Sequence, residues 1–413
     1  MRNVLKRLMV TLLIPVVIAT GCGVSEKAEK NTKLQNESVN QSLQANELDA
    51  DSEKVEEHTE LQNESVNQNF QTYKTGTYSE KGFYTYDDET ACINFIDRDK
   101  HNSHVLCSKI GCNHNNMECS AFLIECDGIY YTGDYLYVLT SDNSGMYKCL
   151  FRLKPDGSEK TEITKLFSYE EEDMASSTEF VIHKGYGYMI INWMDTNAVE
   201  EKEQVIYKVA LDDGSKEEIF KMSGYCPQIY ITNTDEDMLY FCTTSYVEGN
   251  PENVEYKGYQ YNALDKSVEP IELDGDLQFR AQYGENIYAL KRERTFTNYS
   301  TFCEKKLEIY RVDQDGKQSD CIYSMPQEEI DKETEVMTIN IDEKYIYLFE
   351  NVMARKYIIK IISNDGKESF EYEYDPKLHC VWCDGTFLLM QDSKSREYVL
   401  HNIKSGKDII VKQ

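Results

Sequence analysis

The sequence Glu-Ile-Tyr-Arg-Val-Asp-Gln-Asp-Gly-Lys at residues 308–317 is a short alternating strand that ends in a tight Asp-Gly turn. Six further stretches share this strand and turn. The closer copies are residues 150–158, 206–215 and 358–367, and the looser ones are residues 94–101, 260–267 and 400–407. Seven copies of one unit along a chain predict a repeat architecture.

A second mark precedes these units, namely a polar turn followed by an apolar strand that ends in Tyr or another bulky residue. Tyr137, Tyr188, Tyr240 and Tyr288 end four of these strands, at a spacing of about 50 residues. That period fits one four-stranded blade. We therefore expect an all-β fold, a β-propeller of seven blades over residues 73–413. Six blades would result if the first unit only completes the last, and a pair of β-sandwiches is the rival fold.

The composition sets limits on the partners. The chain has 413 residues, of which 31 are Tyr and 15 are Phe, and these rings supply much of the area that strands can bury. The net charge of -29 argues against a nucleic-acid partner, because a polyanion would be repelled. The same charge suits a soluble, self-repelling surface protein.

The first 21 residues carry the pattern of a secretory leader. Positive charges come first, residues 8–18 are apolar, and Ala-Thr-Gly-Cys ends the segment at Cys22. This ending resembles the lipobox of bacterial lipoproteins. The resemblance implies a lipoprotein signal peptide at residues 1–21 and acylation of Cys22, which would anchor the chain in a lipid bilayer at the extracytoplasmic face of the cell membrane. The alternative is an ordinary secretory signal with an incidental cysteine.

Residues 22–72 are rich in Asn, Gln and Glu and poor in aromatic residues, which predicts a disordered tether. Leu-Gln-Asn-Glu-Ser-Val-Asn-Gln at residues 34–41 recurs unchanged at residues 61–68, as a recent internal duplication would leave it. A flexible coil of this length would hold the propeller roughly 40 Å from the membrane.

A cysteine and histidine cluster occupies residues 104–119, between the first and second expected blades. Cys107, Cys112, His114 and Cys119 follow the spacing Cys-x4-Cys-x-His-x4-Cys. Three thiolates and one imidazole this close in sequence can surround a tetrahedral zinc ion, and soft ligands favour zinc over calcium. With four protein ligands and no open position, such a zinc would be structural.

Two other interpretations of this cluster stay open. Cys107, Cys112, Cys119 and Cys126 could pair as disulfides outside the cell, or the thiols could be reduced and simply packed. The Leu-Cys…Cys-x-His…Cys block and the strand marks resemble a family of uncharacterised lipoproteins of Gram-positive bacteria with a propeller of the low-density-lipoprotein-receptor type. The resemblance implies a binding scaffold and transfers no activity.

Two further groups of residues are notable. Cys380 and Cys383 form a Cys-x2-Cys pair on the expected first strand of the last blade, where structural packing is favoured over redox chemistry because no thioredoxin-like βαβ context surrounds them. First strands of blades line a propeller's central channel. Residues expected there are His183, Tyr230, Arg280 and Asn340, although such side chains can point into blade packing instead.

The sequence contains no Gly-x-Ser-x-Gly, no His-Glu-x-x-His, no phosphate loop and no dinucleotide fingerprint. The resulting hypothesis is a membrane-anchored surface lipoprotein whose propeller is a non-enzymatic binding module for an extracellular protein or glycan. The alternative is an extracellular propeller enzyme, a glycan hydrolase or lyase. Its paired carboxylates would come from different blades, so spacing in the sequence cannot locate them.

Overall fold

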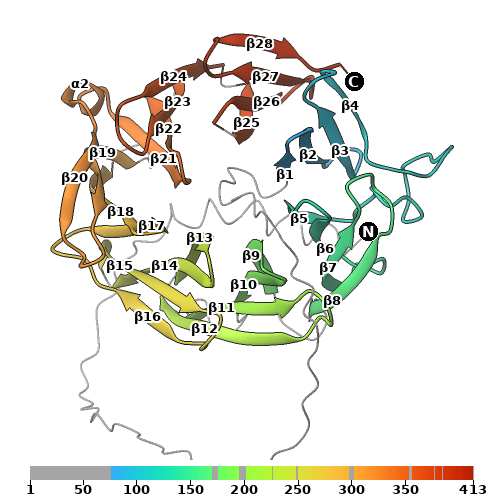
Figure 1. Cartoon of the computed structure of the whole chain (residues 1–413), viewed down its shortest axis with the longest axis horizontal. Coiled ribbons are helices and arrows are strands. Elements are labelled where there is room, and N and C mark those ends of the chain that lie inside the picture. Colours follow the sequence, from blue (N-terminus) through green and yellow to red (C-terminus); the bar gives the residue numbers. More distant parts are fainter. Residues whose placement is uncertain are drawn as a thin grey trace, which may run out of the picture. The chain divides into compact units, whose positions relative to one another are not determined.

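The computed structural model describes residues 76–169, 175–194, 201–225, 227–247, 250–296, 302–352, 356–375, 377–383 and 385–412. Within these residues the chain forms seven four-stranded antiparallel sheets, each built from four consecutive strands. The sheets stand around a ring as the blades of a β-propeller, with the first strand of each blade innermost (Figure 1). The predicted fold class is confirmed, whereas the predicted signal peptide, the predicted acylation site Cys22 and the predicted tether lie outside the described residues.

The blades are numbered in chain order. Blade 1 contains β1 Gly76–Ser79, β2 Gly82–Asp87, β3 Cys92–Asp97 and β4 Asn102–Val105. Blade 2 contains β5 Cys126–Tyr131, β6 Leu136–Ser141, β7 Tyr147–Leu153 and β8 Thr161–Ser168. Blade 3 contains β9 Ala175–His183, β10 Tyr186–Met194, β11 Glu201–Ala210 and β12 Lys216–Tyr225. Blade 4 contains β13 Gln228–Asp235, β14 Met238–Val247, β15 Asn250–Asn262 and β16 Val268–Ile271.

The remaining blades follow the same order. Blade 5 contains β17 Gln278–Tyr283, β18 Asn286–Phe296, β19 Phe302–Val312 and β20 Gln318–Ser324. Blade 6 contains β21 Thr334–Ile341, β22 Tyr345–Val352, β23 Lys356–Ser363 and β24 Ser369–Tyr374. Blade 7 contains β25 Leu378–Cys383, β26 Phe387–Asp392, β27 Tyr398–Asn402 and β28 Lys407–Ile410. The short helix α2, Gln327–Ile330, joins blades 5 and 6.

Burial follows the position of a strand within its blade. Every residue of β6 is buried, whereas β24 alternates between exposed and partly buried residues. Middle strands therefore have apolar side chains on both faces, and outer strands keep one polar face. The core lies between adjacent blades, since one buried cluster joins Ile93 of blade 1 with Ile129 and Val138 of blade 2. Stacking the blades thus buries faces that a single sheet would expose.

The recurring Asp-Gly turn has a structural cause. Gly157, Gly214 and Gly316 all have positive φ angles, of +79°, +73° and +77°. A Cβ atom on any of them would lie 2.2–2.5 Å from a backbone carbonyl oxygen of the preceding blade or of the chain that leaves it. In blades 2, 3 and 5 the turn between the third and fourth strands therefore packs against the neighbouring blade too closely for any side chain. This contact explains why the turn is the clearest repeat in the sequence.

Side chains near the inner strands also join the blades. Three of these hydrogen bonds run from Ile231 N to Glu179 Oε2 (2.8 Å), from Gln282 N to Asn233 Oδ1 (3.2 Å) and from Arg280 Nε to Ile339 O (3.0 Å). Each bond joins a side chain of one blade to a backbone group of the first strand of another blade. Polar residues of the inner strands therefore serve the scaffold.

The ring closes between blades 7 and 1. Ser103 N donates to Lys412 O at 2.7 Å, and Lys412 N donates to His101 O at 2.9 Å, so the end of the chain pairs with β4. Thr85 and Tyr398 share a hydrogen bond of 2.9 Å between their hydroxyl groups. Blade 1 is complete in itself, which rules out the six-bladed alternative. A pair of β-sandwiches is likewise ruled out.

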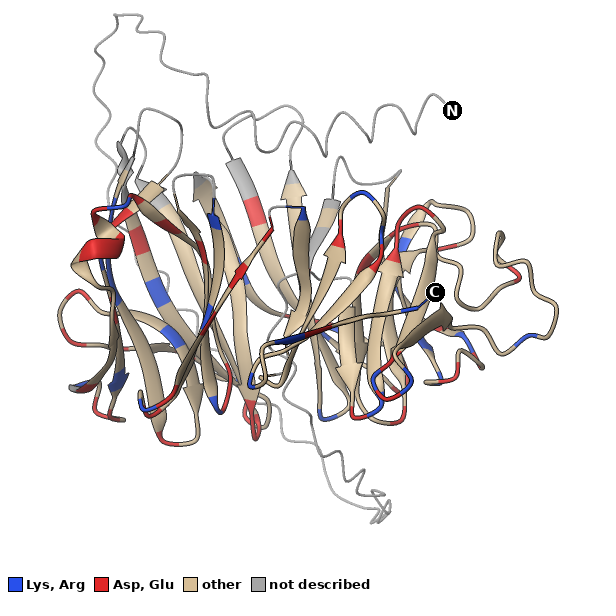
Figure 2. Cartoon of the chain, turned by 90° about the horizontal axis from the view of Figure 1, so that it is seen from above, with Lys and Arg blue, Asp and Glu red and all other residues tan. Residues whose placement is uncertain are grey.

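Charge is distributed unevenly over the blades. Figure 2 shows many acidic and basic residues in the turns at the strand ends, while the strand bodies are mostly uncharged.

Among the described residues, no helix has the length and apolar character needed to span a membrane.

Candidate metal centre

The chain between β4 and β5 forms a loop whose two ends meet at one residue of blade 1. Leu106 N donates to Ile93 O at 2.8 Å, and Ile93 N donates to Ala121 O at 2.9 Å. Leu106 and Ala121 are both buried against the core between blades 1 and 2. Because both ends are fixed on Ile93, the residues just inside the loop are brought close together.

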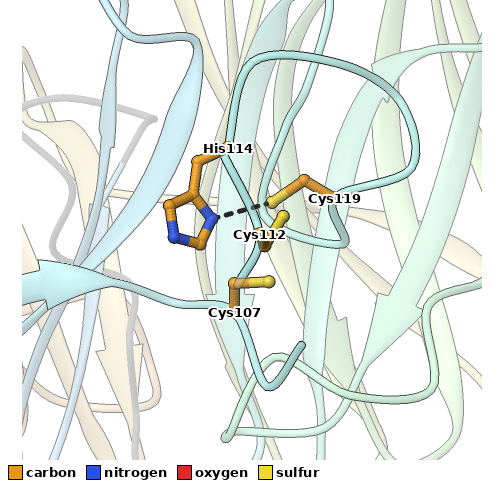
Figure 3. A group of neighbouring side chains, drawn as sticks. All are labelled: Cys107, Cys112, His114 and Cys119. Atoms are coloured by element: carbon orange, nitrogen blue, oxygen red, sulfur yellow. Dashed lines mark hydrogen bonds between the residues drawn. The ribbon is translucent and has the colours of Figure 1, made fainter. Parts of the chain in front are cut away.

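The four residues predicted from the sequence converge inside this loop (Figure 3). The Sγ atoms of Cys107, Cys112 and Cys119 and a ring nitrogen of His114 all lie within 4.8 Å of one another. His114 Nδ1 is 3.3 Å from Cys119 Sγ. Cys119 is buried, and the other three residues are partly exposed.

The donor set fits a zinc ion. Zinc bound at about 2.3 Å to each sulfur places neighbouring sulfur atoms roughly 3.8 Å apart in a regular tetrahedron. The observed upper limit of 4.8 Å is within about 1 Å of that spacing, so small side-chain rotations would complete the shell. Four protein ligands leave no position for substrate, so the ion would stabilise the loop and perform no chemistry.

The backbone at His114 has a conformation that is uncommon for residues other than glycine. His114 has a φ angle of +54°, a conformation that costs free energy for residues other than glycine. Its carbonyl oxygen accepts a hydrogen bond from the thiol of Cys92 on β3 at 3.2 Å. Burial raises the pKa of Cys92 to about 11, so Cys92 stays protonated and acts as a donor to the loop.

Two of the ligand thiols differ in acidity without a metal. Burial opposes ionisation of Cys107, but hydrogen bonds from the Lys109 backbone and from the Cys119 and Cys112 thiols outweigh it, and the pKa of Cys107 is lowered. Burial raises the pKa of Cys119, and its hydrogen bonds with the two other thiols raise it further. Cys107 would therefore lose its proton first, and a bound divalent ion would displace the remaining protons.

The cysteines that the structure describes are all free, so no disulfide joins any two of them. Cys126 lies outside the group of four, and its thiol faces Gly128 O at 3.6 Å. Cys380 and Cys383 are buried on the first strand of blade 7, where the sequence places them, and they belong to the core between blades 1, 6 and 7. Their environment agrees with structural packing.

The four residues expected at the channel lie on the first strands of blades 3 to 6. His183 and Arg280 instead contact the next blade, at Glu236 O (2.5 Å) and Ile339 O (3.0 Å). Tyr230 is partly buried beside the core of blades 4 and 5. Asn340 is half-buried, and its Nδ2 atom has no hydrogen-bond partner among the described residues.

Sequence reasoning missed the residues that surround the metal centre. Cys92 is 15 positions before Cys107 on another strand, and Lys160 belongs to blade 2, where its Nζ donates to Phe122 O at 2.9 Å. Neither residue belongs to the ligand motif, and no periodic signal marks them. Cys92 is close to the loop because both loop ends bond to its neighbour Ile93, and the proximity of Lys160 depends on how blades 1 and 2 pack.

Comparison with known proteins supports the fold. No protein-family model and no curated protein matches the chain. An acylaminoacyl peptidase of Pyrococcus horikoshii superposes with a TM-score of 0.52 at 9% identity, over 84% of this chain and 53% of the peptidase. The β-propeller domain of the Trilobed protease from Pyrococcus furiosus gives 0.50 at 9% identity, over 83% of this chain and 97% of that domain.

An uncharacterised protein of Listeria monocytogenes gives a TM-score of 0.42 at 14% identity, over 68% of this chain and 80% of its own. The chain spans about half the length of the acylaminoacyl peptidase. At these identities the likeness shows the propeller fold alone, and the lipoprotein family stays a prediction.

Proposed function

We propose that the protein is a non-enzymatic binding module, held by a lipid anchor at the outer face of the cell membrane. The propeller would present its rigid ring of loops to an extracellular protein or glycan. A disordered tether would allow it to reach a ligand beyond the membrane surface. The propeller fold supports this proposal because it is a rigid scaffold whose function depends on its loops and not on the sheets themselves.

The observation that carries the proposal is the state of the inner-strand carboxylates. The first strands of the blades contain four of them, and each has a structural partner. Asp127 contacts Lys148 Nζ (2.9 Å), Glu179 accepts from Ile231 N (2.8 Å), Asp235 accepts from Gly284 N (2.6 Å) and Glu335 is hydrogen-bonded to the side chain of Asn351.

A glycan hydrolase of the usual kind needs two carboxyl groups that face the substrate and exchange protons with it or attack it. The four inner carboxylates belong to blades 2, 3, 4 and 6 and serve contacts within the scaffold. This arrangement supports binding over the hydrolase or lyase alternative.

A direct test uses the full mature chain and a panel of defined cell-wall and plant-type oligosaccharides, together with extracellular-matrix proteins. We expect saturable binding of one class, with the bound glycan recovered unchanged by mass spectrometry after long incubation. Shortened or unsaturated products that depend on the protein would overturn the proposal in favour of the enzyme.

The lipid anchor at Cys22 is the second part of this proposal. Acyl chains on one cysteine would give stable membrane attachment, since each buried CH2 group contributes about 0.8 kcal/mol. Cys22→Ala should move the protein from the membrane fraction into the medium, whereas Cys226→Ala, at a cysteine far along the chain, should leave it on the cells. Retention of the Cys22→Ala protein in membranes would count against lipidation.

The third part concerns the metal centre. We propose that Cys107, Cys112, His114 and Cys119 bind one structural Zn²⁺, which supplies a cross-link between the two ends of the loop. Protein purified under reducing conditions should contain about one zinc per chain, and Cys112→Ser should lose most of it. Cys149→Ser, at a buried cysteine in β7, is the matched control. Metal analysis that finds no zinc in the reduced protein, even after zinc is supplied, would refute the proposed zinc site.

A further inference from the structure

Lys160 lies beside the metal centre but comes from a different blade. It stands just before β8 in blade 2, and its Nζ donates to Phe122 O at 2.9 Å. Phe122 N in turn donates to the carbonyl of the ligand Cys119 at 3.2 Å. Lys160 therefore holds the turn that positions Cys119, and its ammonium also lies 5.3 Å from the centre of the Phe151 ring.

Lys160 is partly buried, and its charge partners distinguish it from the buried lysines of the chain. Lys148 and Lys360 contact carboxylates, and Lys208 lies over tyrosine rings. Among the described residues, no carboxylate oxygen lies within 4.0 Å of Lys160 Nζ. Burial lowers the pKa of Lys160 to about 8, and the groups whose negative charge would raise that pKa again are the sulfurs of Cys119, Cys126 and Cys92.

The charge of a zinc-bound metal centre would explain why Lys160 lies near sulfur atoms and has no carboxylate partner in the described part of the chain. Three thiolates and a neutral imidazole around a divalent ion leave one net negative charge. Lys160 and three of the four ligands are partly buried, and a charge that has lost part of its water without gaining a partner is costly. A single positive charge from Lys160 would offset the charge of the centre, so each would compensate for the other.

We propose that Lys160 is the charge partner of the metal centre, a positioning residue that strengthens zinc binding by neutralising the thiolate cluster and fixing the turn after Cys119. This inference rests on the zinc site proposed above. It also assigns the ion a role between blades, because the loop is fixed to blade 1 through Ile93 and to blade 2 through Lys160.

The chain offers a matched control in the next blade. Lys216 begins β12 of blade 3, and its Nζ donates to Lys165 O and Leu166 O of blade 2, both at 3.0 Å. It makes the same kind of bond from the fourth strand of one blade to the chain of the preceding blade. Its acceptors lie on β8, which contains no cysteine. Replacing Lys216 therefore removes a comparable contact without changing the charge near the thiolates.

The experiment measures zinc affinity of the full mature chain by competition with a chromophoric chelator under reducing conditions. Lys160→Met should weaken zinc binding by about 10- to 100-fold, the range found for groups that support metal ligands. Lys160→Arg should retain most of the affinity, and Lys216→Met should bind zinc as the wild type does. Lys160→Gln, which keeps a donor but loses the charge, should resemble Lys160→Met and is measured if that variant does not fold.

The outcomes separate the two proposals. A wild-type chain that takes up no zinc refutes the metal site itself, and the role of Lys160 with it. If the wild type binds zinc and Lys160→Met binds it equally well, the metal site stands and the role of Lys160 is refuted. Equal weakening in Lys160→Met and Lys216→Met would show a general loss of stability, and would also refute it. Weakening confined to the uncharged Lys160 variants supports the inference.

Discussion

The close approach of the Asp-Gly turns to neighbouring blades can be tested at Gly214. Gly214 has a φ angle of +73°, and a Cβ atom there would lie 2.5 Å from Ile163 O, a backbone atom of β8. Gly406 occupies the same position in the turn of blade 7 with a φ angle of +64°, but a Cβ atom there would meet nothing within 4 Å. Alanine at either position bears the same backbone strain, and only at Gly214 does it also overlap with another blade.

The expected magnitudes follow from these two terms. A left-handed backbone costs a residue other than glycine about 1–2 kcal/mol, partly offset by the lower chain entropy of unfolded alanine. Forcing an extra methyl group into a packed contact adds about 1–3 kcal/mol, and the residues on either side of Ile163, Glu162 and Thr164, are both paired with β7. We expect Gly406→Ala to lower the free energy of unfolding by about 1 kcal/mol, and Gly214→Ala by about 2–4 kcal/mol.

The assay is equilibrium urea unfolding of both variants and the wild type, followed by intrinsic fluorescence at fixed pH and temperature. The informative quantity is the difference between the two variants, because the shared backbone term cancels. Equal unfolding midpoints for Gly214→Ala and Gly406→Ala would refute the idea that contact with the preceding blade selects glycine in this repeat.

Three other predictions concern single residues. Glu304→Gln should lower the free energy of unfolding by about 3 kcal/mol in urea titrations, because the largely buried charge of Arg292 loses its partner. Arg311 forms an exposed ion pair with Asp320, so Arg311→Gln, the control, should cost less than about 1 kcal/mol. Burial raises the pKa of Glu350 to about 7, so the folded protein keeps a proton that the unfolded chain releases above pH 4.5, and stability falls between those values. Glu350→Gln lacks this titration, so its free energy of unfolding relative to the wild type should rise by about 1–3 kcal/mol from pH 5 to 7. A difference between the two proteins that does not change with pH would contradict the raised pKa of Glu350. Gly157→Ala, which would press on Leu106 O beside the first ligand, should weaken zinc uptake by the chelator assay more than Gly214→Ala does.

The sequence predicted the fold through features that are local in the chain. Strand alternation and Asp-Gly turns each depend on a few neighbouring residues, and their recurrence at about 50 residues indicated the number of blades. The pairing of β1 to β4 into one sheet decided that residues 82–97 belong to a complete first blade. The closure of the ring, through the contact of Ser103 with Lys412, depends on tertiary structure, because it joins parts of the chain that no local pattern connects.

The candidate metal centre divides in the same way. Cys107, Cys112, His114 and Cys119 could be predicted because one loop of 13 residues holds them all, so their spacing alone limits how far apart they can lie. The partners Cys92 and Lys160 could not, since Cys92 reaches the loop through the pairing of its neighbour Ile93 with both loop ends, and Lys160 reaches it only after blades 1 and 2 have packed. Short loops bring their own residues together whatever the rest of the chain does, whereas contacts between blades exist only once burial of the apolar sheet faces has fixed the orientation of each blade.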